Sequence, residues 1–194
     1  MKLIFDFDDV IMNTSLLKKK ITSSFYKLGV PKEITDNYYE LRDKNIPFSL
    51  KLFLMSFLEK EKIKSVSYLE LYEKIMKICP DILNKEVVQI AQNAGKENSF
   101  IVTNGDKEFQ MDKIKKSGIE SFFSEIYITN GSKKDIVENI CLKNLNEKVI
   151  FVDNKIEFFN DLDIERCKNL KTILYDANGF ENLVVEIKKP EIES

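Results

Sequence analysis

The chain opens with KLIFDFDDVIMNTS (residues 2–15), in which an apolar run stops at three aspartates, Asp6, Asp8 and Asp9. An apolar run with little alternation is typical of a strand that is buried on both faces of a parallel sheet. Burying an unpaired carboxylate is costly, so these acids either are solvated at the strand end or face a cation. The stretch predicts a core strand with a polar site at its carboxyl end.

The composition excludes several classes of function. The chain has 194 residues, which suits one full domain with a modest insertion. Its 30 basic and 32 acidic residues leave a net charge of -2, so no basic field attracts nucleic acid or an anionic membrane. It contains no histidine, which excludes Ser-His-Asp and Cys-His nucleophile systems and histidine-ligated zinc hydrolases.

The same composition indicates a cytoplasmic protein. No segment approaches the roughly 18 apolar residues that span a membrane, and acids break the apolar N-terminal run too early for a signal peptide. The three cysteines, Cys79, Cys141 and Cys167, are far apart and odd in number. They fit reduced, buried thiols better than disulfides or a zinc site.

The periodicity of apolar residues changes along the chain. After a cap at Asn13 or Thr14, residues 15–28 and most of residues 31–85 have helical spacing. Strand-like runs followed by helices then recur from residue 98 to the end, which predicts a parallel sheet with right-handed crossovers. We therefore expect an α/β fold with a three-layer Rossmann-like core (residues 1–13 and 90–194) and a helical block (residues 14–89) inserted after the first strand.

Polar residues follow the predicted strands, where the carboxyl ends of a parallel sheet form a ligand crevice. They include Thr103, Lys133 and Asp153 besides the first acids. Carboxylates suit Mg²⁺, while a hydroxyl, backbone N–H groups and a lysine suit a phosphate. An aspartate beside Mg²⁺ can attack phosphorus, and a second one can move the proton.

Four segments in this order resemble the motifs of the haloacid dehalogenase (HAD) superfamily. The first, LIFDFDDVI, has Asp6, Asp8 and Val10 at the positions of the DxDx[TV] motif. The others are FIVTN with its Thr103, the lysine segment GSKKDIV, and the acid-ended strand VIFVDNKIE. The resemblance covers residues 2–176 and implies that the helical block is the family's cap.

The resemblance to the phosphatases of this superfamily implies a role for each matching residue. Asp6 would be the nucleophile and Asp8 the general acid and base, with Mg²⁺ held by Asp6, the Asp8 carbonyl and Asp153. Thr103, the backbone N–H of Asn104, and Lys133 would bind the phosphoryl group. The implied activity is a Mg²⁺-dependent phosphomonoesterase that acts through an aspartyl-phosphate.

The match departs from the family pattern in the last two motifs. Lys134 also stands in the lysine segment, but the spacing to the following apolar residues favours Lys133. Asn154 replaces the second of two adjacent acids, which puts full metal affinity in doubt, and Glu157 is its candidate replacement. Asp9 occupies the variable position of the first motif.

Other readings remain open at this point. The aspartates could be solvated strand ends, and Asp153 could be an ordinary N-cap. A non-catalytic binding or regulatory protein is the main alternative, with Asn154 as its support, and a dehalogenase or a phosphomutase ranks below it. Arg42, in the helical block, is a surface residue or a substrate contact. We expect a small phosphorylated substrate and no nucleic-acid or membrane partner; the sequence indicates no oligomeric state.

Overall fold

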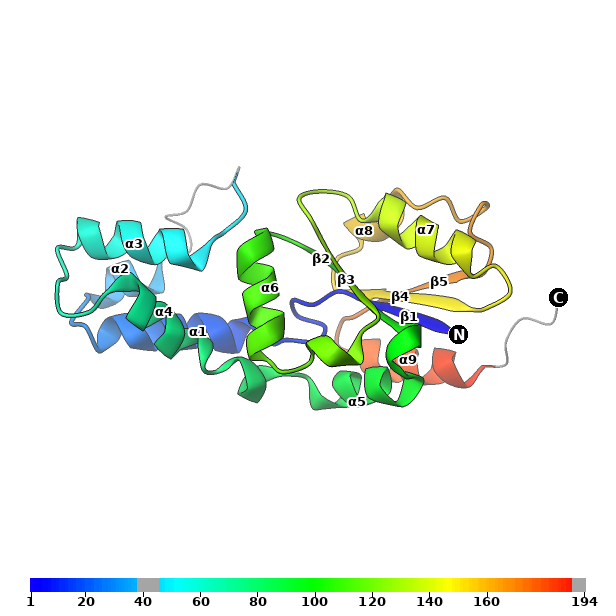
Figure 1. The fold of residues 1–194 in the computed structure, drawn as a ribbon, viewed down its shortest axis with the longest axis horizontal. Helices are drawn as coiled ribbons and strands as arrows, with labels where there is room; N and C mark the ends of the chain where they lie inside the picture. Colours follow the sequence, from blue (N-terminus) through cyan, green and yellow to red (C-terminus); the bar gives the residue numbers. More distant parts are fainter. Residues whose placement is uncertain (38–45, 190–194) are drawn as a thin grey trace. The chain divides into compact units, whose positions relative to one another are not determined.

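The computed structural model describes residues 1–37 and 46–189 (Figure 1). It confirms the predicted α/β fold, with a parallel sheet in the order β3-β2-β1-β4-β5. Because the chain leaves β1 toward β2 and β3 and then returns to β4 on the other side of β1, the strand order reverses at β1 and β4. The strands are β1 (Lys2–Phe5), β2 (Ser99–Asn104), β3 (Glu125–Thr129), β4 (Val149–Asp153) and β5 (Leu170–Leu174).

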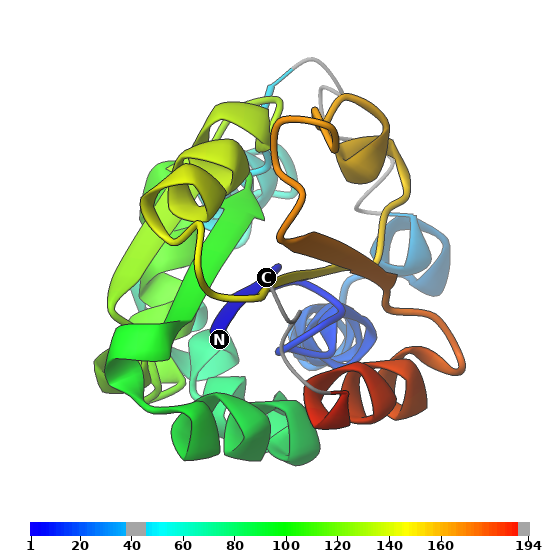
Figure 2. The ribbon, with the colours of Figure 1, turned by 90° about the vertical axis from the view of Figure 1, so that its right-hand side faces the viewer.

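Helices cover both faces of this sheet (Figure 2). One face carries α5 (Lys85–Ala94) and α9 (Gly179–Lys188), and the other carries α7 (Lys134–Lys143) and the short α8 (Glu157–Asn160). Apolar side chains of the strands and of α7 form one buried cluster on the second face. Its strand and helix members include Ile4, Phe100, Val102, Val137, Ile140, Cys141, Val149 and Phe151.

The chain divides into two compact units. The first, here called the sheet unit, contains Met1–Met12, Asn84–Asn104 and the residues from Ile119 on. The second, the helical unit, contains Asn13–Leu83 and Gly105–Gly118. Its helices are α1 (Thr14–Tyr26), α2 (Lys32–Asp36), α3 (Leu50–Lys60), α4 (Tyr68–Met76), the 3₁₀ turn Cys79–Ile82 and α6 (Lys107–Lys116).

The helical unit is built by local capping and aromatic packing. The Asn13 side chain accepts a hydrogen bond from the Leu16 N–H, so Asn13, rather than Thr14, is the N-cap of α1. Phe25 of α1 stacks on Phe57 of α3 with ring centroids 4.4 Å apart, a contact that stabilises beyond its buried area. The helix predicted over residues 33–44 extends largely outside the described residues, and Arg42 lies wholly outside them.

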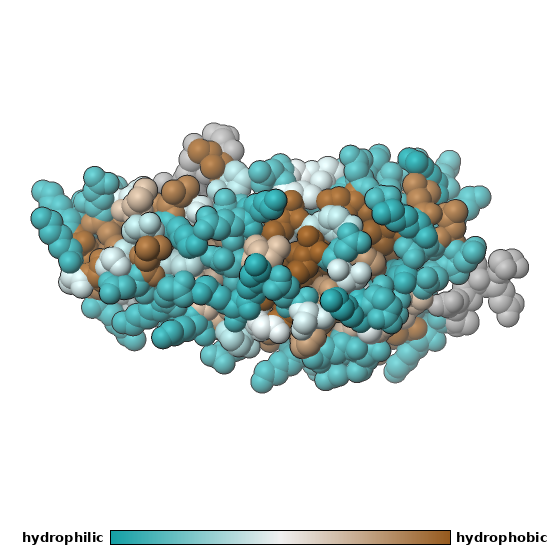
Figure 3. All heavy atoms as spheres, viewed as in Figure 1, coloured by the Kyte–Doolittle hydropathy of each residue, from teal (hydrophilic) through white to brown (hydrophobic). Residues whose placement is uncertain are grey.

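The predicted buried thiols are confirmed: Cys79, Cys141 and Cys167 are buried and form no disulfide. Hydrophilic side chains cover most of the face shown in Figure 3, with apolar side chains interspersed among them. Within the described part of the chain, no helix combines the length and the apolar character needed to cross a bilayer.

Asn169, just before β5, fixes the C-terminal end of α7 and the segment that follows it. Its buried Nδ2 donates to the carbonyl oxygens of Asn144 (2.9 Å) and Glu147 (3.0 Å) and lies 3.3 Å from that of Cys141. We expect Asn169→Ala to lower the free energy of unfolding by about 1–3 kcal/mol, because one buried and two partly buried carbonyls lose their donor. Urea unfolding measures this, with the exposed Lys168→Ala as the control; equal stabilities would contradict the anchoring role.

Candidate active site

A buried lysine lies between two buried carboxylates at the centre of the sheet unit. Lys133 Nζ is 2.8 Å from Asp6 Oδ1 and 2.6 Å from Asp153 Oδ2. The three residues are only 1%, 5% and 0% exposed. The contact with Asp153 is a hydrogen bond, whereas the contact with Asp6 is an ion pair without hydrogen-bond alignment.

The sheet itself brings the two carboxylates together. Phe5 of β1 pairs with Val152 of β4, and the Asp6 N–H donates to the Val152 carbonyl at 2.9 Å. Asp6 and Asp153 are therefore the next residues on neighbouring strands. Since side chains alternate between faces along a strand, both lie on the face that carries α7, whose N-cap residue is Lys133.

Aromatic rings complete the surroundings of the ammonium group. Lys133 Nζ lies 4.3 Å from the centroid of the Phe158 ring and 5.9 Å from that of Phe151. A desolvated cation over a ring face gains electrostatic stabilisation. These rings and the two carboxylates surround the ammonium group and exclude water from it.

Burial sets the protonation behaviour of both carboxyls. Desolvation raises the pKa of Asp6 to about 6, and the Lys133 charge opposes this rise. Desolvation also raises the pKa of Asp153, again opposed by Lys133. The site therefore contains carboxylates whose charge depends on the lysine, as is common where chemistry is performed.

A tight turn follows β1 and carries the other two acids. The carbonyl of Phe7 accepts hydrogen bonds from Ile11 N–H and Met12 N–H, and the Asp9 N–H donates to the Met12 carbonyl. Asp9 has φ +61°, a left-handed conformation that aspartate tolerates because its short side chain can bond locally. Asp9 is exposed, while Asp8 is half-buried.

The end of β2 supplies a hydroxyl and an amide. Thr103 is fully buried, and its Oγ1 has no hydrogen-bond partner in the described structure. Asn104 Nδ2 donates to the Gly131 carbonyl at 2.7 Å and to Thr129 Oγ1 at 3.3 Å. The Asn104 side chain thus ties β2 to the loop that carries Lys133, a contact that no local sequence pattern indicates.

The alternative candidates lie apart from this buried group. Lys134 has a side chain that is 39% exposed and stands 3.8 Å from Glu138. Glu157 is exposed in the first turn of α8. Asn154 is half-buried, and its Oδ1 is buried without a partner in the described structure. The structure therefore brings together Asp6, Lys133 and Asp153, and leaves Lys134 and Glu157 at the surface.

Two further residues hold the lysine loop in place. Ser132 Oγ donates to Asp161 Oδ2 at 2.6 Å and accepts the Lys134 N–H at 3.0 Å. A serine ahead of a helix commonly bonds to the helix's first N–H groups, so Ser132 was recognisable from the sequence. Asp161 was not, because nothing in its local sequence points to a contact with the loop.

The residues fit a hard divalent cation such as Mg²⁺. The available donors are carboxylate, amide and carbonyl oxygens, which Mg²⁺ prefers. Asp6, Asp8 and Asp153 outnumber the single charge of Lys133, so the strand ends carry excess negative charge. Among the described residues no cluster of three or more acidic, histidine or cysteine side chains forms. A cation here would therefore need a backbone carbonyl, such as that of Asp8, or the amide oxygen of Asn154.

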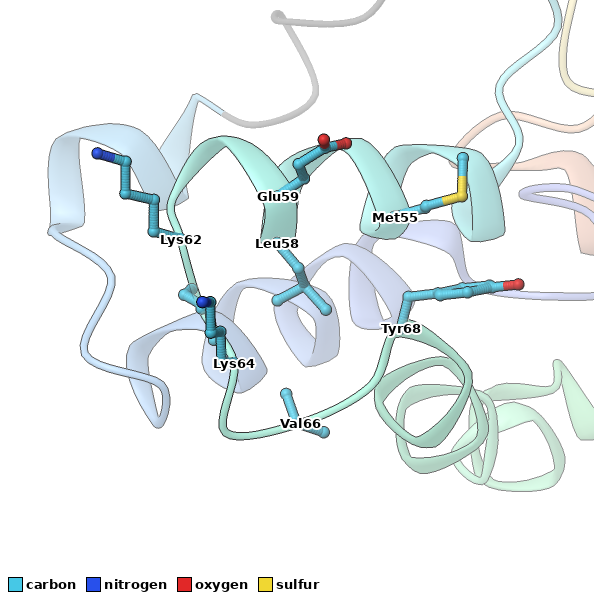
Figure 4. Close-up of a pocket in the computed structure, with 8 residues that line it drawn as sticks. Met55, Leu58, Glu59, Lys62, Lys64, Val66 and Tyr68 are labelled. Carbon is cyan, nitrogen blue, oxygen red and sulfur yellow. The ribbon is translucent and has the colours of Figure 1, made fainter.

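A second concave region lies in the helical unit (Figure 4). It has a volume of about 450 Å³ and lies between the end of α3 and the start of α4. Apolar side chains, among them Met55, Leu58 and Val66, form most of its wall, with Lys62 and Lys64 at one end. It has no pair of carboxylates among its lining residues, so the sheet unit remains the candidate site.

Known structures share this fold at low sequence identity. The HAD-hydrolase YfnB of Bacillus subtilis, bound to magnesium, matches 97% of this chain and 98% of its own at TM-score 0.57 and 16% identity. A Thermotoga maritima protein assigned as a beta-phosphoglucomutase matches 96% of this chain and 100% of its own, at TM-score 0.55 and 15% identity. A dehalogenase matches 97% of this chain and 97% of its own, at TM-score 0.58 and 11% identity. No curated protein matches the chain in sequence.

The sequence model described as "Haloacid dehalogenase-like hydrolase" matches residues 3–172. This range contains the buried carboxylates, the lysine between them and the unpartnered threonine hydroxyl. The chain therefore belongs to the haloacid dehalogenase-like hydrolases.

Proposed function

We propose that this hydrolase is a Mg²⁺-dependent phosphomonoesterase that acts on a small phosphorylated metabolite through an aspartyl-phosphate. The observation that carries the proposal is the buried Lys133 ammonium held against Asp6 and Asp153 at the switch point of the sheet. A cation beside a desolvated carboxylate suits an anionic substrate and a carboxylate nucleophile. Asp8 stands two residues after Asp6, where the superfamily's phosphatases carry their proton-transfer acid.

In the first step, a carboxylate oxygen of Asp6 attacks phosphorus and the bond to the ester oxygen breaks. Asp8, in its protonated form, gives its proton to the leaving alkoxide, so the alcohol departs neutral. In the second step, Asp8 takes a proton from water, and the water oxygen attacks phosphorus. Phosphate leaves, Asp6 is regenerated and Asp8 is protonated again, so one ester and one water give one alcohol and one phosphate.

The remaining residues hold the transferred group. The Thr103 hydroxyl, the Asn104 N–H and the Lys133 ammonium would bind the phosphoryl oxygens and stabilise their charge. Mg²⁺ held by Asp6, the Asp8 carbonyl and Asp153 would neutralise charge on the phosphoryl group when bound. The buried, unpartnered Thr103 Oγ1 supports this assignment, because a buried hydroxyl usually has a partner.

From the sequence we assign residues 1–13 and 90–194 to the catalytic core and residues 14–89 to a helical cap that selects the substrate; α6, although inside the core range, packs with the helical unit. The second candidate function is a HAD-fold protein that binds metal or phosphate without turnover. Asn154, in place of an acid, supports it. A dehalogenase has weaker support, because the superfamily's dehalogenases lack an acid at the position of Asp8.

A substrate panel tests these functions against one another. Purified protein is incubated with small phosphomonoesters, with a 2-haloacid and with hexose 1-phosphate, each with Mg²⁺ or with a chelator. Mg²⁺-dependent release of phosphate is the expected result. Release of halide would identify a dehalogenase, and an isomerised sugar phosphate without free phosphate would identify a mutase. Binding of Mg²⁺ without any turnover would favour the binding protein.

Replacing Thr103 tests the phosphate site directly. We expect Thr103→Val to weaken inhibition by inorganic phosphate about 10-fold or more, because a hydrogen bond to a charged group is lost. The melting temperature should stay the same or rise, because the buried hydroxyl has no partner to lose. Thr103→Ser keeps the hydroxyl and should retain the wild-type inhibition constant; equal constants for valine and wild type would exclude Thr103 from the phosphate site.

A further inference from the structure

Helix α6 follows the phosphate-binding end of β2 in the chain but packs with the helical unit. Tyr72 of α4 is 1% exposed, and its hydroxyl donates to Asp112 Oδ2 of α6 at 2.7 Å. Burial, followed by the hydrogen bond to Asp112, raises the pKa of Tyr72, so the phenol remains a donor at neutral pH.

Lys51 of α3 adds a second connection to the same helix. Its Nζ is 3.0 Å from Asp112 Oδ2 and 2.7 Å from Glu108 Oε1. The same ammonium lies 4.8 Å from the centroid of the Tyr72 ring. Because the tyrosine, the aspartate and the lysine contact one another, they form one network rather than separate surface pairs, and such networks couple their members more strongly.

An exposed pair strengthens the attachment. Lys116, near the end of α6, is 2.6 Å from Glu73 Oε2 of α4. Exposed ion pairs contribute little on their own. Among the polar contacts that attach α6, the main one is therefore the cluster of Tyr72, Asp112 and Lys51, here called the α6 clamp; buried Phe109 and Ile114 add apolar packing.

The chain enters and leaves α6 at glycines. The boundary between the units falls at Asn104–Gly105 before the helix and at Gly118–Ile119 after it. Gly105 has φ +147° and Gly118 has φ +73°, conformations that other residues adopt only with strain. Glycine at both ends of α6 therefore lets the chain make the turns that connect this helix to the sheet unit.

We propose that the α6 clamp positions the phosphate-binding end of β2, so that displacement of the helical unit is transmitted through α6 to Thr103 and Asn104. Tyr72, Asp112 and Lys51 are thus positioning residues. The link to phosphate rests on the proposed function, whereas the membership of α6 in the helical unit does not. The chain connects the N-terminal side of α6 to β2 covalently, since Gly105 directly follows Asn104. The α6 clamp connects the helix to α3 and α4 of the helical unit.

Hydrogen exchange of the full-length protein tests the membership of α6 without any substrate. Leu54 of α3 is fully buried, so Leu54→Ala should destabilise the helical unit. Amides of α6 should then lose protection in parallel with amides of α4, while amides of β4 keep theirs. In Tyr72→Phe, which loses the hydrogen bond to Asp112, the amides of α6 should lose more protection relative to wild type than the amides of α4 do. Exchange of α6 in parallel with β4 in the Leu54→Ala protein would overturn the proposal.

Binding of inorganic phosphate tests the positioning role. We expect Tyr72→Phe and Asp112→Asn each to weaken phosphate affinity about 3- to 10-fold, the usual size of coupling through a packed network. The matched control is Ser67→Ala, which removes the capping box of α4 without touching the clamp and should leave affinity unchanged. Equal affinities for wild type, Tyr72→Phe and Asp112→Asn would overturn the positioning role.

The two measurements separate this inference from the proposed function. If Thr103→Val binds phosphate as well as wild type does, the phosphate assignment fails, and with it the link between the clamp and the site. The exchange data, which need no phosphate, decide independently whether α6 belongs to the helical unit. Failure of the clamp alone would appear as weakened phosphate binding in Thr103→Val but not in Tyr72→Phe.

Discussion

Asp6→Asn is expected to lower the turnover number by at least about 10³-fold while the protein stays folded, as loss of a nucleophile does in enzymes that work by covalent catalysis. The amide has the shape of the carboxyl but lacks the charge needed to attack phosphorus. Asp153 still pairs with Lys133 through a 2.6 Å hydrogen bond, so the buried ammonium keeps a counter-charge. Initial rates on the best ester of the panel, with circular dichroism to verify folding, measure the effect.

The matched control for this variant is Asp9→Asn. Asp9 belongs to the same turn and is exposed, and asparagine tolerates its left-handed backbone. This variant should retain the wild-type rate. Mass spectrometry of acid-quenched protein should find a phosphoryl group on wild type and Asp9→Asn but not on Asp6→Asn. Comparable rates for the Asp6 and Asp9 variants would remove Asp6 from the chemistry and move the assignment toward the binding protein.

Much of the sheet unit could be predicted because its signals are local. An apolar run that ends in acids marks β1, and the repeated alternation of strand and helix requires a parallel sheet. Residues at the carboxyl ends of such strands necessarily gather on one edge. The proximity of Asp6 and Asp153, 147 positions apart in the chain, follows from this topology once β1 and β4 are neighbours.

The contacts that hold the site could not be predicted, because they join distant residues of ordinary type. The sequence Asn104-Gly105 is typical of a turn, yet the Asn104 side chain donates to the Gly131 carbonyl in the loop that carries Lys133. Asp161 holds Ser132 from the segment after α8. The attachment of α6 to the helical unit is likewise invisible locally, since α6 has the pattern of any crossover helix. Only three-dimensional packing distinguishes it.

The choice between Lys133 and Lys134 shows what the sequence could predict about the site and what it could not. Their spacing to the apolar positions of α7 favours Lys133, since a residue just ahead of the helix can turn toward the sheet while the next one lies on its solvent side. The structure buries Lys133 and leaves the Lys134 side chain 39% exposed. What the spacing could not predict is that the same lysine contacts both carboxylates, because that depends on the register of β1 with β4.

Lys133→Met is expected to lower the free energy of unfolding by about 3–5 kcal/mol at pH 8, the cost of leaving a buried charge without its partner. Methionine fills a similar volume but leaves two buried carboxylates, Asp6 and Asp153, facing each other. Lys134→Met, one residue on, removes an exposed lysine and should change stability by less than about 0.5 kcal/mol. Guanidinium unfolding with a chelator present measures both, so that no bound metal can replace the ammonium.

The pH dependence separates lost charge compensation from lost packing. Lys133 lowers the pKa of Asp6, which burial raises from 3.8 to about 6, so removing the lysine should raise this pKa further. A carboxyl whose folded pKa exceeds its unfolded value binds more protons when folded, so stability falls as pH rises through the interval between the two values. The difference in free energy of unfolding between Lys134→Met and the less stable Lys133→Met should therefore be markedly smaller at pH 5 than at pH 8. If this difference in free energy of unfolding were equal at pH 5 and pH 8, Lys133 would act through packing. Its charge would then not be what keeps the Asp6 nucleophile ionised.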